Sequence, residues 1–273
     1  MSALDGASGF PRIDTSRPHP ARMYDWFLGG KDNYPVDEAM GRQLMALEPN
    51  IPVITRINRA FMQRATRWAA AQGVRQFLDI GTGIPTEPNL HQVAQRVAPE
   101  TRVVYCDHDP IVLTHAEALL RGTPEGAIDY VQADARDTEL ILERAGKILD
   151  FGRPVALSMI ALLHFLSDED GAQAVVDRLK AAPAPGSYVV LSHITSDFHS
   201  AEVTREADSK YKASGLTLAP RSRAAFTRFF EGLDLVEPGV VLAEQWHPEL
   251  GEAVPGQEDG FASPMYAAVA RVP

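Results

Sequence analysis

The stretch Arg75-Gln-Phe-Leu-Asp79-Ile-Gly81-Thr-Gly83-Ile-Pro85-Thr86 decides how this chain is interpreted. It begins as a short apolar run, reaches an acidic residue and ends in a pair of glycines. Glycine lets the backbone turn sharply and approach a ligand closely, and a helix that follows such a turn offers free N–H groups. In open α/β sheets this arrangement follows the first strand. The segment therefore predicts a nucleotide-like ligand at the end of a buried strand.

Short apolar runs alternate with helical segments on both sides of this stretch. The runs lie at residues 76–80, 102–106, 128–133, 154–160 and 187–194. Continuous apolar runs of this length are typical of parallel strands that are buried on both faces, and their alternation with helices predicts a doubly wound α/β sheet. Two later runs, 235–243 and 265–272, bring the expected count to seven strands in a mostly parallel sheet that ends in a hairpin.

The first 72 residues have a different pattern of apolar residues, which predicts a helical extension before the sheet. Apolar residues recur there at spacings of three and four, as in Met40 and Leu44 and again in Ile57 and Phe61. We expect an N-terminal arm and helices over 1–72 that cover the site, and a Rossmann-like domain over 73–273.

The composition narrows the choice of partner. Of the 273 residues, 26 are Lys or Arg and 36 are Asp or Glu, and the net charge of −10 disfavours nucleic acid and anionic membranes as partners. No apolar stretch is long enough to span a membrane, no secretory signal is recognisable, and the single cysteine, Cys106, cannot form an internal disulfide. These features predict a cytoplasmic protein that acts on a small molecule.

Two classes of cofactor compete for the glycine turn. A dinucleotide-binding turn has a third glycine at the sixth place, where this chain has Thr86, so a nicotinamide-dependent oxidoreductase is disfavoured. The pattern Asp79-x-Gly81-x-Gly83 instead resembles motif I of the class I, seven-stranded S-adenosylmethionine-dependent methyltransferases. That resemblance implies that Asp79 ends the first strand and that Gly81, Thr82 and Gly83 face the amino-acid part of S-adenosylmethionine.

The next two strand ends extend the resemblance. The second strand ends in Cys106-Asp107-His108, and the resemblance implies that Asp107 accepts hydrogen bonds from both ribose hydroxyls, with His108 beside it. The third ends in Ala133-Asp134-Ala135, which the resemblance assigns to adenine, with the Asp134 carboxylate accepting from the amine and the Ala135 N–H donating to the ring. Each acid alone could cap a helix or orient a turn, but three in strand-end register favour the cofactor site.

More specifically, the chain resembles a little-characterised family of S-adenosyl methyltransferases over nearly its whole length. The resemblance rests on Ala21-Arg-Met-Tyr-Asp-Trp-Phe-Leu-Gly-Gly-Lys-Asp-Asn33, on Asn58-Arg-Ala-Phe61, on the glycine turn and on Asp107-x-Asp-Pro110. In the first of these segments, two glycines follow a short amphipathic helix. We expect the loop to fold over the methionine end of the cofactor, with Arg22 or Lys31 near its carboxylate; the alternative is an ordinary helix end with a solvated loop.

Catalysis leaves a weaker signal in the sequence. Methyl transfer requires an aligned acceptor, exclusion of water and, for oxygen or nitrogen acceptors, removal of a proton. His164 follows the fourth strand and is our candidate base, with His193 as the other histidine at that edge; a packed structural role is the alternative for both. No ligand spacing indicates a metal.

Two interpretations of function therefore stand beside each other. The first is an S-adenosylmethionine-dependent methyltransferase with an unidentified small-molecule acceptor. The second is a regulatory protein that binds an S-adenosyl ligand without turnover, which would explain why no catalytic base is obvious.

Overall fold

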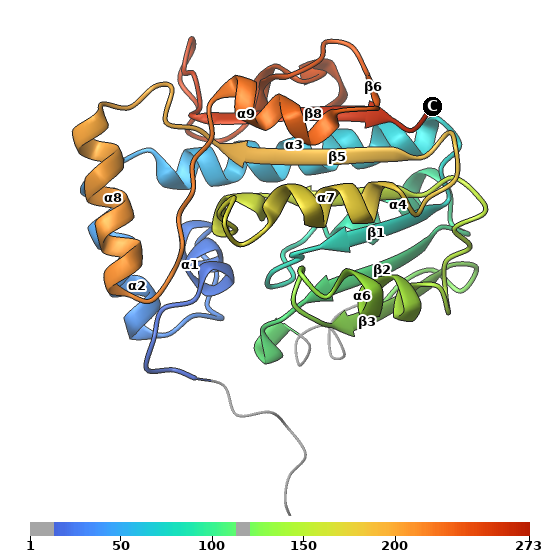
Figure 1. The fold of residues 1–273 in the computed structure, drawn as a ribbon, viewed down its shortest axis with the longest axis horizontal. Helices are drawn as coiled ribbons and strands as arrows, with labels where there is room; N and C mark the ends of the chain where they lie inside the picture. Colours follow the sequence, from blue (N-terminus) through green and yellow to red (C-terminus); the bar gives the residue numbers. More distant parts are fainter. Residues whose placement is uncertain (1–13, 113–120) are drawn as a thin grey trace, which may run out of the picture.

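The computed structural model describes residues 14–112 and 121–273 and shows a sheet with helices on both faces (Figure 1). The strands are β1 (Gln76–Ile80), β2 (Arg102–Asp107), β3 (Ala127–Gln132), β4 (Ala156–Ile160), β5 (Tyr188–Ile194), β6 (Asp234–Leu235), β7 (Val241–Leu242) and β8 (Met265–Arg271). Their order is β3-β2-β1-β4-β5-β8-β6, and β7 also pairs with β8. The first five strands are parallel and β8 is antiparallel to β5, which confirms the doubly wound, mostly parallel sheet.

Among the described residues the sheet has eight strands, because the run expected at 235–243 is divided. Both of its parts, β6 and β7, pair antiparallel with β8. Between them lie Pro238, which has no N–H for a strand ladder, and Gly239, whose φ of +80° turns the chain.

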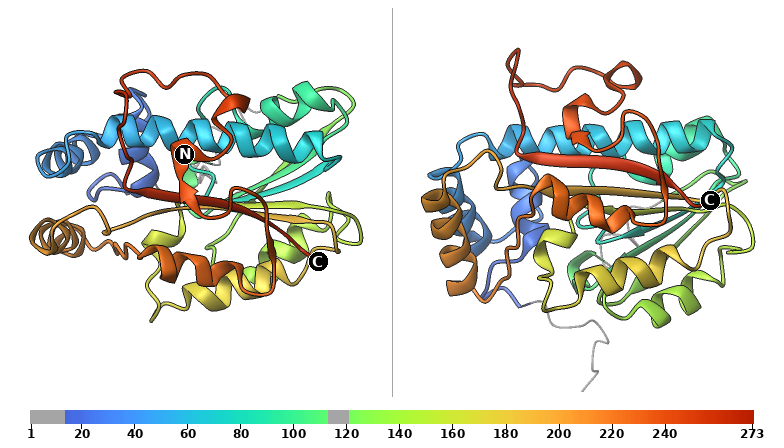
Figure 2. Two further views of the ribbon diagram at one scale, coloured as in Figure 1. Left: turned by 90° about the horizontal axis from the view of Figure 1, so that it is seen from above. Right: turned by 45° about the horizontal axis from the view of Figure 1, so that its top comes forward.

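Two helical layers cover the sheet. The helices are α1 (Pro20–Phe27), α2 (Pro35–Met45), α3 (Ile51–Ala71), α4 (Leu90–Val97), α6 (Thr138–Ala145), α7 (Ala172–Lys180), α8 (Ala201–Ala213) and α9 (Arg223–Thr227), with short 3₁₀ turns η1 (Leu163–Phe165), η2 (Arg228–Phe230), η3 (Ala243–Gln245) and η4 (Pro248–Leu250). One face of the sheet packs against α3 and α4 and the other against α6, α7 and α9 (Figure 2).

Strand β1 shows why apolar runs form the centre of this sheet. All five of its residues are buried, because successive side chains point to opposite faces and both faces are covered. Leu78 packs in the core under α6 and α7, whereas Phe77 packs under α3 and α4. The strand thereby carries Asp79 to the carboxyl edge of the sheet.

Helices α1, α2 and α8 gather beyond that edge, at the left of Figure 1. They share an apolar cluster in which Met23, Phe27, Leu44 and Tyr211 are buried. Helix α3 continues from this group across the sheet and shares its core with β5 and β8. The division at residue 72 stays a prediction. Residues 1–13 of the expected arm lie outside the described residues.

Candidate functional site

Two neighbouring cavities open at the carboxyl edge of the sheet. The first, the strand-end cavity, has a volume of about 140 Å³ and lies at the ends of β1, β2 and β4. The second, the apolar cavity, has a volume of about 180 Å³ and lies between the sheet edge and helices α1, α2 and α8. Pro20, Tyr24, Ala161 and Phe165 line both cavities, so one group of side chains forms their common wall.

The glycine turn forms the floor of the strand-end cavity. Asp79, Gly81, Thr82 and Gly83, the residues predicted to face the cofactor, all line it. Gly81 and Gly83 have φ values of +73° and +68°, a region that favours glycine. A Cβ on Gly81 would lie 2.6 Å from Leu162 Cδ1, whereas a Cβ on Gly83 would have Ala21 Cβ, at 3.9 Å, as its nearest neighbour. The backbone conformation therefore favours glycine at both positions, and a side chain at position 81 would also displace Leu162.

The Asp79 carboxyl group is buried beneath this turn. Its Oδ1 accepts a hydrogen bond of 2.5 Å from Ser158 Oγ on β4. Burial raises the pKa of Asp79 to about 6, although the Ser158 hydrogen bond and the charge of Arg59 act in the opposite direction. A cation brought into the cavity would favour the ionised form and lower that pKa again.

Asp107 joins the end of β2 to the turn after β1. Its Oδ2 accepts from the Gly83 N–H at 2.8 Å and its Oδ1 accepts from the Asp109 N–H at 3.0 Å. The side chain is buried and lines the strand-end cavity. The carboxylate is therefore fixed in direction, as recognition of a diol requires.

His108 lines the same cavity and meets a residue that precedes α1. Its Nε2 lies 3.1 Å from His19 Nε2, and His19 Nδ1 lies 3.1 Å from Asp109 Oδ2. Burial lowers the pKa of His19 although Asp109 is close. The start of the N-terminal helical region therefore closes one side of the strand-end cavity.

At the end of β3 the structure separates the two predicted residues. Ala135 lines the strand-end cavity together with Ala133, but Asp134 does not. Both Asp134 oxygens accept from the Arg136 guanidinium, at 2.9 and 2.7 Å, and this pairing lowers the pKa of Asp134 to about 2. The carboxylate thus already has a cationic partner.

Arg22 and Lys31 line neither cavity. The buried Arg22 guanidinium donates to the carbonyls of Asp14 and Arg17, at 3.0 and 2.7 Å, and lies 3.3 Å from Asp37 Oδ1. Lys31 is exposed. Contact of Arg22 or Lys31 with the cofactor stays a prediction. In the structure, the hydrogen bonds and the ion pair of Arg22 hold together segments of the N-terminal region.

The loop that carries Lys31 is organised around Asp25. Asp25 Oδ2 accepts from the Asp32 N–H and from Asn33 Nδ2, both at 2.9 Å. Gly30 lies so close that a Cβ there would be 2.0 Å from Asp25 Oδ1. These contacts account for the glycine at position 30 and the asparagine at position 33.

A hydrogen-bonded chain that the sequence did not reveal supports the common wall. The Ala161 N–H donates to Ser192 Oγ at 2.9 Å, and Ser192 Oγ donates to Asn58 Oδ1 at 2.6 Å. Asn58 Nδ2 donates to Tyr24 Oη at 2.8 Å, and Tyr24 Oη donates to the Thr55 carbonyl at 3.2 Å. The chain links α1, α3, β5 and the end of β4, where Ala161 has a φ of +53°.

Arg59 is a second residue that the sequence analysis missed. It lines the strand-end cavity and donates to the carbonyls of Thr86 and, at 3.0 Å, of Pro88. These contacts hold a positive charge beside the glycine turn. The only signal in the sequence was its position in the segment Asn58-Arg-Ala-Phe61, which carried no assigned role.

His164 lies in η1 and lines the apolar cavity, not the strand-end cavity. Only 4% of the residue is exposed, and Nδ1 has no hydrogen-bond partner among the described residues. Burial, with smaller effects from His193 and Arg221, holds the pKa of His164 well below 6.5. The imidazole is therefore neutral near pH 7. His193 Nε2 is engaged with Arg221 Nη1 at 2.8 Å, and it lines neither cavity.

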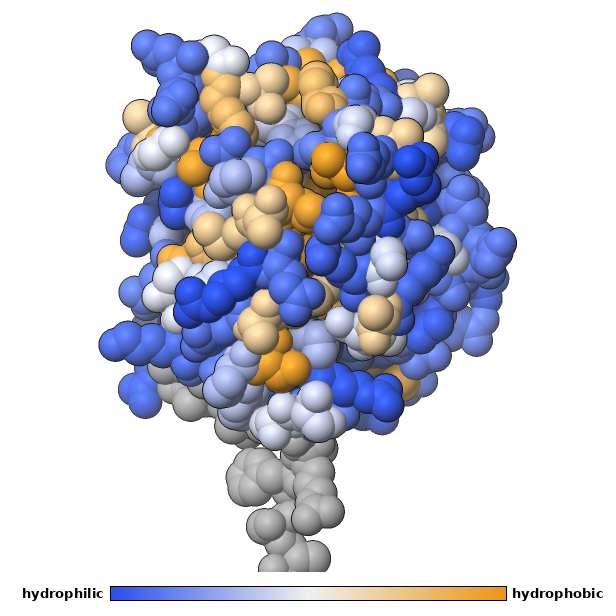
Figure 3. Space-filling model, turned by 90° about the vertical axis from the view of Figure 1, so that its left-hand side faces the viewer, coloured by the Kyte–Doolittle hydropathy of each residue, from blue (hydrophilic) through white to orange (hydrophobic). Residues whose placement is uncertain are grey.

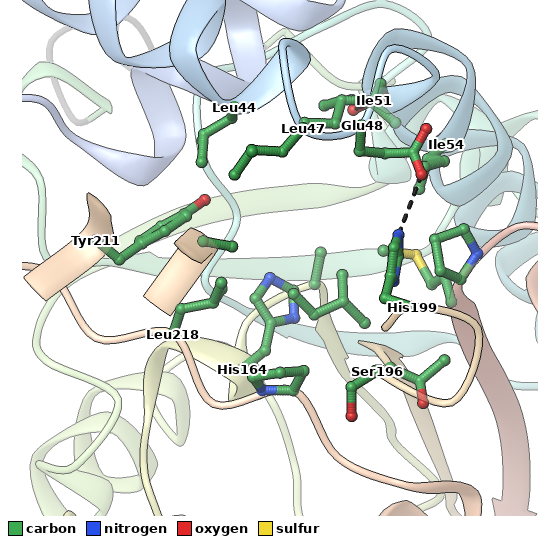
Figure 4. A pocket seen from close by; sticks show the side chains of 18 of the residues that line it. Leu44, Leu47, Glu48, Ile51, Ile54, His164, Ser196, His199, Tyr211 and Leu218 are labelled. Atoms are coloured by element: carbon green, nitrogen blue, oxygen red, sulfur yellow. Dashed lines mark hydrogen bonds and ion pairs between the residues drawn. The ribbon is translucent and has the colours of Figure 1, made fainter. Parts of the chain in front are cut away.

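The apolar cavity has few polar groups (Figure 4). Its apolar lining includes Met23, Phe27, Leu44, Leu47, Ile51, Ile54, Ile194, Val203, Leu218 and Met265. Its lining contains one carboxylate, Glu48, whose Oε2 lies 3.1 Å from His199 Nε2. The side of the molecule that carries α2 and α8 shows hydrophobic side chains gathered in a hollow of a largely hydrophilic surface (Figure 3).

Within residues 14–112 and 121–273, no cluster of three or more His, Cys, Asp or Glu side chains could hold a metal ion. In the same part of the chain, no helix is both long and apolar enough to cross a membrane.

The strand order, the glycine turn and the fixed acid after β2 define a class I S-adenosylmethionine-dependent methyltransferase fold. Comparison with known proteins agrees: a model of the S-adenosyl methyltransferase family matches residues 7–273, and the chain belongs to that family. S-adenosylmethionine is its cofactor. The lining of the strand-end cavity suits this ligand, because it contains the carboxyl groups of Asp79 and Asp107, and carboxylates can bind diols and cationic groups.

Solved structures are similar to the chain over nearly its full length. A DUF574 family protein from Streptomyces avermitilis is 47% identical with a TM-score of 0.89, and covers 96% of this chain and 100% of its own. A protein from Thermobifida fusca is 36% identical with a TM-score of 0.84, covering 98% and 99%. The plantazolicin methyltransferase BpumL, solved with a triazolic desmethylPZN analog and S-adenosylhomocysteine, has a TM-score of 0.50 at 11% identity. The match covers 92% of this chain and 95% of that one and shows the fold alone. No curated protein matches.

Proposed function

We propose that the protein transfers the methyl group of S-adenosylmethionine to a small molecule bound in the apolar cavity. The observation that carries this proposal is the common wall of Pro20, Tyr24, Ala161 and Phe165, which places the two cavities side by side. A cofactor in one and an acceptor in the other would meet there.

The strand-end cavity supplies a partner for each part of the cofactor. Asp107 would accept from the ribose hydroxyls, and Ala133 and Ala135 would border the adenine. Asp79 would attract the cationic end, and Arg59 is a better placed partner for the carboxylate than Arg22 or Lys31, because Arg59 lines the cavity. Gly81, Thr82 and Gly83 would form the turn beneath.

S-adenosylmethionine supplies an activated methyl group, so the protein has to align the acceptor and exclude water. The apolar lining excludes water. Because its Nδ1 is buried and without a partner among the described residues, His164 would accept a hydrogen bond from the acceptor and orient it. We therefore keep His164 as the catalytic candidate: its neutral imidazole would orient the acceptor and take up the proton that methyl transfer releases.

Calorimetric titration tests the cofactor site. We expect S-adenosylmethionine and S-adenosylhomocysteine to bind with micromolar affinity and NAD not to bind. Asp107→Asn should weaken the adenosyl ligands at least tenfold, because a charge-assisted hydrogen bond contributes about 1.5–3 kcal/mol. Asp129→Asn, at an exposed position on β3, is the matched control and should bind as the wild type does. Equal affinity in the wild type and Asp107→Asn, or binding of NAD alone, would contradict the assignment.

A further inference from the structure

The charges around the apolar cavity restrict what it can hold. The described residues that line it include no lysine or arginine, and their one carboxylate, Glu48, faces His199. A phosphate, sulfate or carboxylate placed there would lose its hydration without gaining a cationic partner of its own, and it would approach the negative Glu48.

The lining nevertheless includes a buried side-chain nitrogen that has no hydrogen-bond partner among the described residues. His164 is 4% exposed, lines the cavity and has no hydrogen-bond partner for Nδ1 among the described residues. Figure 4 shows its ring among the apolar side chains, on the opposite side of the cavity from Leu44 and Leu47. Leaving a buried polar atom unpaired costs about 1–3 kcal/mol, so a ligand with a hydroxyl group there would recover that cost.

We infer that the methyl acceptor is an uncharged, mostly apolar molecule that carries a hydroxyl group, and that Glu48 excludes anionic acceptors. This inference rests on the proposed function. The hydroxyl oxygen bonds to the methyl carbon as the carbon–sulfur bond breaks, the electron pair of that bond stays on sulfur, and the hydroxyl proton leaves through His164 to water. The size of the cavity is suitable, because an apolar cavity of about 150 Å³ can hold a benzene ring.

Three one-ring probes of similar shape test the charge preference: 4-ethylphenol, 4-ethylbenzoate and 4-ethylbenzylamine. Each is titrated calorimetrically into the whole protein at pH 8, with and without saturating S-adenosylhomocysteine. We expect 4-ethylphenol to bind at least tenfold more tightly than the anion or the cation. In Glu48→Gln the gap between phenol and benzoate should narrow several-fold, because the repelling charge is gone.

Three variants test where 4-ethylphenol binds. Ala207 lines the apolar cavity from α8, and Ala207→Trp should abolish binding of 4-ethylphenol. Ala213→Trp makes the same change at an exposed position of the same helix, outside the cavity lining, and should leave binding unchanged. His164→Phe keeps a ring in the cavity without its nitrogens and should reduce the affinity for 4-ethylphenol at least fivefold.

The outcomes separate the inference from the proposed function. Tightest binding of the benzoate or of the amine overturns the inference, as does a failure of 4-ethylphenol to bind to a protein that binds S-adenosylhomocysteine. Equal loss of binding in Ala207→Trp and Ala213→Trp also overturns it. If the protein binds none of the adenosyl ligands, the proposed function is overturned instead. The titrations of the three probes without S-adenosylhomocysteine then still show whether the cavity prefers an uncharged ligand.

Discussion

Replacing Asp79 by asparagine should stabilise the ligand-free protein at neutral pH while it weakens cofactor binding. The wild-type carboxyl group is buried, and burial raises its pKa to about 6 from an ordinary 3.8. An acid with a raised pKa in the folded state holds its proton more tightly when folded. Folding stability is therefore lost as the pH rises from about 4 to about 6, and it stays lost above that.

The size of this effect follows from the two pKa values. The difference between about 6 and 3.8, at 1.36 kcal/mol per pH unit, corresponds to about 3 kcal/mol. Between pH 4.5 and pH 7.5 the loss amounts to about 2 kcal/mol, because part of it lies below pH 4.5. Asparagine keeps an oxygen that can accept from Ser158 Oγ, and it does not titrate.

Urea unfolding of both proteins at pH 4.5 and pH 7.5 measures this difference. We expect the free energy of unfolding of Asp79→Asn, relative to the wild type, to rise by about 2 kcal/mol from the lower to the higher pH. Asp129→Asn removes an exposed carboxylate and should show no such change. If the free energies of unfolding of Asp79→Asn and the wild type differ by the same amount at both pH values, the pKa of Asp79 is not raised in the folded protein.

Three further substitutions have expected outcomes. Gly81→Ala combines an unfavourable positive φ with a contact of 2.6 Å to Leu162 Cδ1, so it should destabilise the protein by about 2–5 kcal/mol in urea unfolding. In a Leu162→Ala background the same change should cost less, and an equal cost would argue against the contact. Arg221→Met removes the donor to the buried carbonyls of Leu163 and Leu166 and should lower the free energy of unfolding by about 2–4 kcal/mol. An unchanged midpoint of urea unfolding would contradict this prediction. Tyr24→Phe leaves Asn58 Nδ2 without its acceptor and should cost about 1–3 kcal/mol in thermal unfolding, with no loss expected if the hydrogen-bonded chain does not form in solution.

Local sequence patterns were sufficient for the sheet and for the glycine turn. The residues of β1 are apolar because both faces of the strand are covered, and Gly81 and Gly83 follow at once, so the strand and its turn can be recognised within ten residues. Asp107 was predictable because consecutive parallel strands end at the same edge. The division of the run expected at 235–243 depends on the tertiary pairing of two short segments with β8, although Pro238-Gly239 was a visible break.

Contacts between distant segments could not be read from the sequence. The chain from Tyr24 through Asn58 to Ser192 joins three elements, and no local pattern indicates that these residues meet. The sequence likewise does not reveal which way a charged side chain in a loop points. Lys31 and Asp134 were both predicted to contact the cofactor. In the structure, Asp25 on α1 accepts hydrogen bonds from the loop that carries Lys31, and Asp134 pairs with Arg136.

A crystal structure with S-adenosylhomocysteine would show whether the cofactor occupies the strand-end cavity, beside the apolar cavity proposed for the acceptor. We expect the ribose hydroxyls within hydrogen-bond distance of Asp107 and the sulfur facing the common wall. A ligand bound outside the strand-end cavity, or one whose sulfur faces away from the apolar cavity, would overturn the proposed function.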